Sequence, residues 1–155
     1  MSSTTTTRTT TGTHPVRTAT RAVGVVFLLV GVLGFVPGIT SHFGDMTVAG
    51  HMSDAKLLGL FQVSILHNLV HLLFGVLGIA LSKRASQAKL YLIVGGVVYL
   101  VLWIYGLVIG MDSSANFVPV NSADNWLHFV LGVGMLLLGV VLGRGVSADA
   151  DGDTV

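Results

Sequence analysis

Four long apolar runs are the feature that most constrains what this sequence can fold into. They extend over about residues 22–36, 57–81, 90–109 and 126–142, and none of them contains Asp, Glu, Lys or Arg. A helix needs about 20 mainly apolar residues to cross the hydrocarbon core of a bilayer. Only 10% of the residues are charged, whereas a soluble domain carries about 25%. The sequence therefore predicts an integral membrane protein.

The apolar runs and their flanks divide the chain into one membrane domain and two tails. The predicted spans are about residues 21–37, 57–82, 89–109 and 124–143, within a single domain of residues 21–143. Residues 1–20 are rich in Thr and residues 144–155 are acidic, which is typical of disordered tails. The predicted fold class is all-α, a four-helix bundle in the membrane.

Basic residues gather on one side of the predicted spans. They are Arg8, Arg17, Arg21, Lys83, Arg84, Lys89 and Arg144. The two longer loops, by contrast, hold four Asp residues and only Lys56. The positive-inside rule therefore predicts that both termini and the 82–89 loop lie in the cytoplasm. A formal net charge of +1 gives no basic surface for nucleic acid, so no nucleic-acid partner is expected.

The sequence also contains an internal similarity. NLVHLLFGV (68–76) matches NWLHFVLGV (125–133), 57 positions later, and GVVFLLVGVLGFVPG (24–38) matches GVVYLVLWIYGLVIG (96–110), 72 positions later. Each half thus reads as helix, loop and helix. Because each half crosses the membrane twice, both halves insert in the same orientation, with a pseudo-two-fold axis along the membrane normal. His71 and His128 become equivalent and are expected to face each other.

A polar and small-residue stripe follows one face of the second span and of the fourth. Its members recur every three or four residues, as expected for one face of a helix. They are Ser64, His67, Asn68, His71, Gly75, Gly78 and Ser82, and then Asn125, His128, Gly132, Met135 and Gly139. Small residues let membrane helices approach closely. We therefore expect both stripes to face the interior of the bundle.

These segments resemble a known family. GVVFLLVGVLGFVPGIT, LLGLFQVSILHNLVHLLFGVLGIAL, GGVVYLVLWIYG and NFVPVNSADNWLHFVLGVGM are similar to the small membrane family catalogued as domain of unknown function 4383 (DUF4383), over roughly residues 21–143. HNLVHLLFG and DNWLH are the most distinctive pieces. The resemblance implies a four-span protein of the bacterial inner membrane, and it implies no activity.

The favoured interpretation of the polar stripe is structural. Asn68, His71, Asn125 and His128 are expected to hydrogen-bond to one another between the halves, as polar side chains do between membrane helices. No cofactor is needed for this role. The sequence then predicts a non-enzymatic structural or accessory subunit whose main partner is the lipid bilayer. Its glycine-rich faces also suit a homo-oligomer or packing into a larger membrane complex.

A haem-binding protein is a second interpretation of the same residues. Buried ionisable residues in membrane spans mark candidate functional sites. His71 and His128 would be the axial ligands of a b-type haem, with Asn68 and Asn125 beside them. Gly75 and Gly132 would leave room for the macrocycle.

A metal site or a transport pathway is also compatible with these histidines. His67, His71 and His128 would supply three nitrogen ligands to zinc or copper. A small transporter or proton relay would use histidines that titrate near neutral pH. The large polar side chains of this stripe stop before Gly75, however, which leaves the inner half lined by Gly and apolar residues. A hydrolase is not expected, because the sequence around Ser64 lacks a nucleophile elbow.

Overall fold

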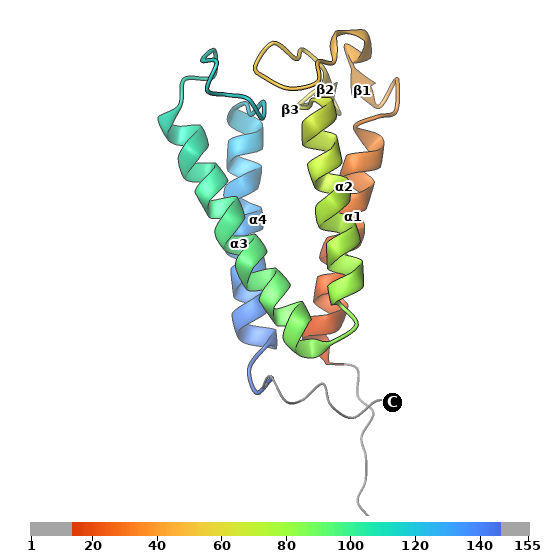
Figure 1. Ribbon diagram of the computed structural model, residues 1–155, viewed down its shortest axis with the longest axis vertical. Coiled ribbons are helices and arrows are strands. Elements are labelled where there is room, and N and C mark those ends of the chain that lie inside the picture. Colours follow the sequence, from red (N-terminus) through yellow and green to blue (C-terminus); the bar gives the residue numbers. More distant parts are fainter. Residues whose placement is uncertain (1–13, 147–155) are drawn as a thin grey trace, which may run out of the picture.

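Four long helices make up most of the protein. The computed structural model describes residues 14–146, within which the helices are α1 (Pro15–Leu33), α2 (Ile65–Leu81), α3 (Ala85–Val108) and α4 (Ser122–Leu142) (Figure 1). The predicted all-α class with four helices is confirmed. By length and composition, α1, α3 and α4 can each cross a membrane, and α2 is a shorter apolar helix of 17 residues.

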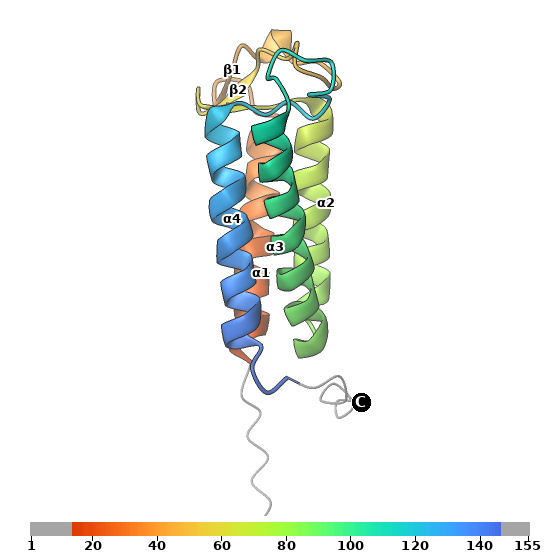
Figure 2. The same ribbon diagram turned by 90° about the vertical axis from the view of Figure 1, so that its left-hand side faces the viewer.

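The helices form two antiparallel pairs. α1 packs mainly against α2, and α3 packs mainly against α4. The pairs lie close together near the turn between α2 and α3 and diverge toward the end that carries the β-strands (Figure 1). All four helices run along the long axis of the molecule, with the irregular segments gathered beyond their ends (Figure 2). We call the end with the strands the sheet end and the end with Lys83 and Arg84 the basic end.

Glycines set the close approach within each pair. A Cβ atom on Gly24 would lie 3.0 Å from the Gly75 carbonyl oxygen and 2.9 Å from the Ile79 nitrogen. In the other pair, a Cβ atom on Gly96 would lie 2.9 Å from the carbonyl oxygen of Gly132. Real side chains do not approach a neighbouring backbone this closely. The helices of each pair therefore pack backbone against backbone, as the small-residue stripes predict.

Aromatic rings fill the space between the pairs. Phe27 of α1 stacks on Tyr99 of α3, with ring centroids 5.4 Å apart. Phe74 of α2 lies 5.8 Å from each of these rings, and the hydroxyl of Tyr91 donates a hydrogen bond to the Phe74 carbonyl oxygen over 2.9 Å. This aromatic layer joins the two pairs.

The first helix begins earlier than the sequence predicts. Pro15 stands at the first helical position, where its fixed φ and missing N–H suit a helix start. Thr20 is fully buried and its hydroxyl donates to the Ala88 carbonyl oxygen, while Arg17 Nε donates to the Ser82 carbonyl oxygen. These contacts hold residues 15–20 in the helix, so assigning them to a disordered tail is wrong. Residues 1–13 and 147–155, where the rest of both predicted tails falls, lie outside the described residues.

The second helix begins later than the sequence predicts. The sequence places the start of a span at residue 57, whereas α2 begins at Ile65. The intervening residues form β2 (Lys56–Leu57) and β3 (Phe61–Gln62), which join β1 (Thr40–Ser41) in an antiparallel sheet of order β1-β2-β3. Positive φ angles at Leu58 and Gly59 make the turn that excludes a helix here.

The remaining boundaries differ by a few residues. α1 ends at Leu33, before the turn that contains Pro37, and a one-turn 3-10 helix covers Phe43–Asp45. α3 begins at Ala85 and ends at Val108, against predicted limits of 89 and 109. α4 begins at Ser122 and ends at Leu142, against predicted limits of 124 and 143.

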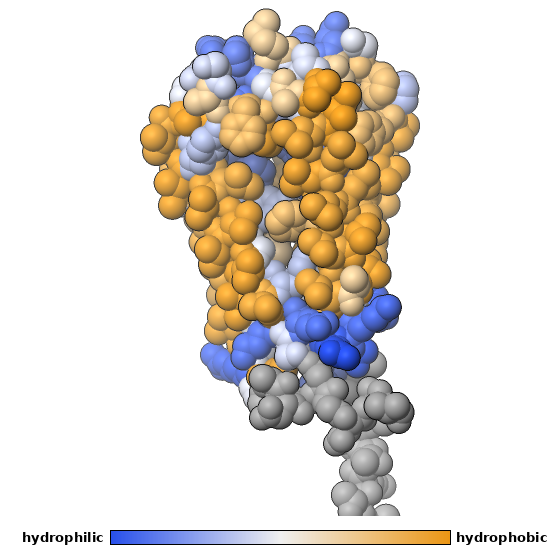
Figure 3. Space-filling view, in the orientation of Figure 1, coloured by the Kyte–Doolittle hydropathy of each residue, from blue (hydrophilic) through white to orange (hydrophobic). Residues whose placement is uncertain are grey.

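The outward faces of the helices are apolar. The space-filling view shows a broad hydrophobic surface along the helices, with hydrophilic residues toward both ends (Figure 3). Side chains such as Val101, Leu107 and Leu137 are more than half exposed on it. Such a surface suits the lipid environment predicted from the sequence.

Filling the glycine contacts is predicted to destabilise the fold. Gly24→Leu and Gly96→Leu should each lower the free energy of unfolding by about 2–3 kcal/mol, because the new side chain meets backbone atoms of the partner helix. Gly134 of α4 is the matched control, since a Cβ atom there meets nothing within 4 Å. Gly134→Leu should be neutral or stabilise by up to about 1 kcal/mol. Unfolding titrations in mixed micelles would measure this, and equal losses for all three variants would contradict it.

Candidate functional site

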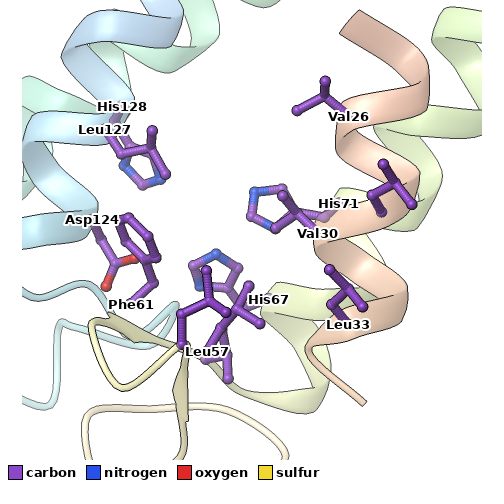
Figure 4. Close-up of a pocket in the computed structure, with 13 residues that line it drawn as sticks. Val26, Val30, Leu33, Leu57, Phe61, His67, His71, Asp124, Leu127 and His128 are labelled. Atoms are coloured by element: carbon purple, nitrogen blue, oxygen red, sulfur yellow. The ribbon is translucent and has the colours of Figure 1, made fainter. Parts of the chain in front are cut away.

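A cavity of about 170 Å³ lies between the helix pairs near the sheet end. α1 and the β2–β3 hairpin supply most of its apolar wall, including Val26, Leu29, Val30 and Phe61. Its polar lining consists of His67, His71, Asp124 and His128. In the close-up, His67 and His71 lie on one side of the cavity, and His128 and Asp124 lie on the other (Figure 4). The divergence of the two pairs thus creates a space that polar groups from α2 and α4 share.

The three histidines converge on this cavity, with His67 in the middle. Its ring centroid is 4.6 Å from that of His71, one turn away on α2, and 6.5 Å from that of His128 on α4. Each of the three residues is at most 6% exposed. In the internal similarity, His67 has no matching His in the second half, because the equivalent position is Asp124. The structure instead makes it the nearest imidazole to both.

The predicted hydrogen bonds between the halves are not formed. His71 Nδ1 and His128 Nδ1 are buried and have no hydrogen-bond partner within residues 14–146. The His71 ring stacks near Phe27 with centroids 5.7 Å apart, and the His128 ring meets the edge of Tyr99 at 5.3 Å. Both residues line the cavity that lies between the two helix pairs.

A hydrogen bond holds the ring of His67. Its Nδ1 lies 3.2 Å from the carbonyl oxygen of Pro119, in the loop before α4. Because a carbonyl oxygen only accepts, Nδ1 carries the proton and donates. A neutral His67 ring therefore presents Nε2 as an acceptor.

The two asparagines contact glycines within their own helix pairs. A Cβ atom on Gly34 would overlap the side-chain amide of Asn68, and one on Gly106 would overlap that of Asn125. The Oδ1 atoms of both asparagines have no conventional hydrogen-bond partner within the described residues. Each glycine Cα–H points toward such an oxygen, a weak contact common between closely packed helices. Neither asparagine lines the cavity.

The geometry does not fit a haem. Gly75 and Gly132, which were expected to leave room for a macrocycle, face the side chains of Leu28 and Leu100. The cavity volume of about 170 Å³ is close to the about 150 Å³ of an engineered cavity that binds benzene. The space therefore suits one ring and is too small for four joined pyrroles.

The predicted three-histidine metal site has no support in this arrangement. No group of three or more His, Asp or Glu side chains within residues 14–146 is placed to hold a metal ion. Although His67, His71 and His128 share one cavity, their rings present faces and edges to one another.

Asp124 lines the cavity but is not one of the predicted site residues. Its Oδ2 accepts hydrogen bonds from the backbone N–H groups of Gln62 at 2.9 Å and Asn121 at 3.0 Å. With the Asn121 side chain it forms a capping box that starts α4. The signal that could have found it is the internal similarity, because position 124 matches His67 at the 57-residue offset.

Comparison with known proteins identifies a family. The family model described as "Domain of unknown function (DUF4383)" matches residues 17–141. The chain therefore belongs to this family, as the resemblance in the sequence predicts. No curated protein and no solved structure matches the chain.

Removing the Asp124 carboxylate is predicted to loosen the hairpin that covers the cavity. Asp124→Ala leaves two backbone N–H groups without their acceptor and should cost about 1–3 kcal/mol of unfolding free energy. Hydrogen exchange of the Gln62 amide should accelerate at the same time. Asp112→Ala, at an exposed position in the loop between α3 and α4, is the control and should change neither quantity. An unchanged Gln62 exchange rate in Asp124→Ala would contradict the assignment.

Proposed function

We propose that this member of the DUF4383 family is a non-enzymatic, four-span membrane protein that acts as an accessory protein by binding a small ligand in its histidine cavity. The observation that carries the proposal is the pair of buried, unpartnered nitrogens on His71 and His128 beside that cavity. An unsatisfied buried polar group costs about 1–3 kcal/mol. A purely structural bundle gains nothing from that cost, whereas a ligand that enters the cavity and bonds to these two imidazole rings offsets it.

Helix dimensions and charge support four spans. The 17 residues of α2 measure about 25 Å at 1.5 Å per residue, and α2 packs along α1, which is long enough to cross. Basic residues gather at the ends of helices on one side, namely Arg17, Arg21, Lys83, Arg84, Lys89 and Arg144. The positive-inside rule then places the basic end and both termini in the cytoplasm, with the sheet end outside. The proposed location is the bacterial inner membrane.

Equivalent contacts support an origin by duplication. The contact of Gly24 with Gly75 corresponds to that of Gly96 with Gly132, at the sequence offsets of 72 and 57 residues. In both helix pairs, the glycine of the first helix faces the carbonyl oxygen of the glycine on the second helix. They favour two parallel repeats, α1–α2 and α3–α4, with a pseudo-two-fold axis along the membrane normal.

The ring contacts follow the same offsets. Phe27 packs on His71 in the first pair, and Tyr99 packs on His128 in the second. Phe27 and Tyr99 are themselves equivalent positions and stack on each other. A pseudo-two-fold axis would pass between these two rings, which explains why they meet.

The hydrogen bonds of Ser64, His67 and Asp124 support a role without catalysis. The Ser64 hydroxyl accepts from the His67 backbone N–H and caps α2. His67 Nδ1 is held by Pro119, and Asp124 Oδ2 is held by two backbone N–H groups. Ser64, His67 and Asp124 therefore stabilise the ends of helices and loops and do not form a nucleophile–base pair.

Transport is less well supported than binding. The polar lining of the cavity stops at the aromatic layer of Phe27, Phe74 and Tyr99, below which Met135 and Leu92 are buried. A relay or channel needs polar groups that continue across the membrane. The apolar helix faces remain available for lipid, for a second copy of the chain or for a larger membrane complex.

The proposed topology predicts a labelling pattern. The chain contains no Cys, so single cysteines report their own positions. A membrane-impermeant maleimide added to intact cells should label Val48→Cys and Asp112→Cys at the sheet end. It should label Lys83→Cys and Arg144→Cys only after the cells are opened. All four positions are exposed in the structure.

Other patterns would contradict the topology. Labelling of Val48→Cys and Lys83→Cys under the same condition would mean that α2 does not cross the membrane. Labelling of only the basic-end positions in intact cells would reverse the orientation.

A further inference from the structure

The size of the cavity restricts its occupant to one ring. Its volume of about 170 Å³ slightly exceeds the about 150 Å³ of an engineered apolar cavity that takes up benzene. Phe61 contributes an aromatic ring to the wall. Aromatic rings favour one another in edge or offset contact by about 0.5–1.5 kcal/mol beyond the area that they bury. A six-membered aromatic ring is therefore a good match.

The cavity is partly open on an apolar surface. Two of its wall residues on α1, Val26 and Leu29, are 51% and 54% exposed, and Leu58 of the hairpin is also largely exposed. In the proposed placement, these residues face the outer half of the bilayer. A ligand that reaches the cavity by this route is dissolved in the membrane, and an apolar tail can remain outside among the lipids.

The charge of the lining favours a neutral headgroup. No Lys or Arg among residues 14–146 lines the cavity, so a carboxylate or phosphate would enter without a counter-charge from these residues. The one acidic side chain of the lining, Asp124, already receives two backbone N–H groups on Oδ2. Burying an unpaired charge is costly, which makes an anionic lipid headgroup a poor occupant.

The polar groups match a hydroxyl. A neutral imidazole has one N–H donor and one bare nitrogen acceptor, and a hydroxyl both donates and accepts. His67 presents Nε2 as an acceptor because its Nδ1–H donates a hydrogen bond to the carbonyl oxygen of Pro119. His71 and His128 stand beside it with nitrogens that have no partner in the described chain. A ring hydroxyl placed among them would receive and give hydrogen bonds at once.

We propose that the cavity binds a hydroxylated aromatic ring, the phenol or quinol headgroup of a membrane-soluble molecule with an apolar tail. This inference rests on the proposed membrane placement and names the ligand class of the same site. The ring lies between α1, the hairpin and α4, and its hydroxyl reaches the histidines. The tail leaves between Val26 and Leu29.

Binding of matched probes tests the ligand class. The full chain in lipid nanodiscs would be titrated with 4-decylphenol, decylbenzene and decylamine by calorimetry. The phenol should bind, and decylbenzene, which lacks only the hydroxyl, should bind at least about tenfold more weakly. Imidazole nitrogen resonances of His71 and His128 should shift with the phenol and not with decylbenzene. Equal affinity for all three probes, or preference for the amine, would overturn the proposal.

Two kinds of variant locate the site. His71→Phe and His128→Phe keep a ring in place and should each weaken phenol binding about tenfold. Val26→Phe narrows the mouth while keeping every histidine, and should weaken binding by a similar factor. Val25→Phe is its matched control, because Val25 is the adjacent, 43% exposed residue of α1 that does not line the cavity. Equal binding by the Val25 and Val26 variants would place the phenol elsewhere and overturn the proposal.

The outcome is separable from that of the proposed function. If the cysteine pattern gives four spans and 4-decylphenol does not bind, the ligand class is wrong and the membrane placement stands. If the cysteines are not labelled in the predicted pattern, the proposed entry of the ligand from the bilayer is wrong, whatever binds to the purified protein.

Discussion

The contact between an asparagine amide and a glycine backbone is the interaction on which the rest of the structure depends. The missing side chain of a glycine leaves a space, here called a notch, that the asparagine amide of the neighbouring helix fills. Asn68 fills the notch at Gly34 between α1 and α2, and Asn125 fills the notch at Gly106 between α3 and α4. Burying an amide in apolar surroundings costs free energy unless the amide finds a polar or close backbone contact. Each notch therefore fixes the rotation and height of one helix against its neighbour.

Tight packing within the pairs determines the looser arrangement between them. Because the glycine faces are used inside each pair, only larger side chains remain to fill the gap between α1–α2 and α3–α4. Phe27 and Tyr99 fill it at mid-height, and toward the sheet end the pairs diverge around the histidines. The asparagines set the positions of these histidines, since Asn68 adjoins His67 and Asn125 precedes His128 by less than one turn.

The sequence predicts the parts of this structure that depend on periodicity. The apolar runs identify four helices, and the three-or-four spacing identifies the inward stripes of α2 and α4. Parts that depend on three-dimensional context escape it. The apolar residues Leu57 and Phe61 look like the start of a span, but the turn at Leu58 and Gly59 makes them a hairpin. The role of Asp124 depends on a bond to Gln62, 62 positions away, which no local pattern reports.

The most direct test is a double-mutant cycle on Gly34 and Asn68, measured as unfolding free energy in mixed micelles. Gly34→Ala should be destabilising in the natural chain, because the new methyl group displaces the amide. In the Asn68→Ala background the notch is empty, so the same substitution should cost at least about 1 kcal/mol less. Equal costs of Gly34→Ala in both backgrounds would mean that the amide does not occupy the notch, which would contradict the account.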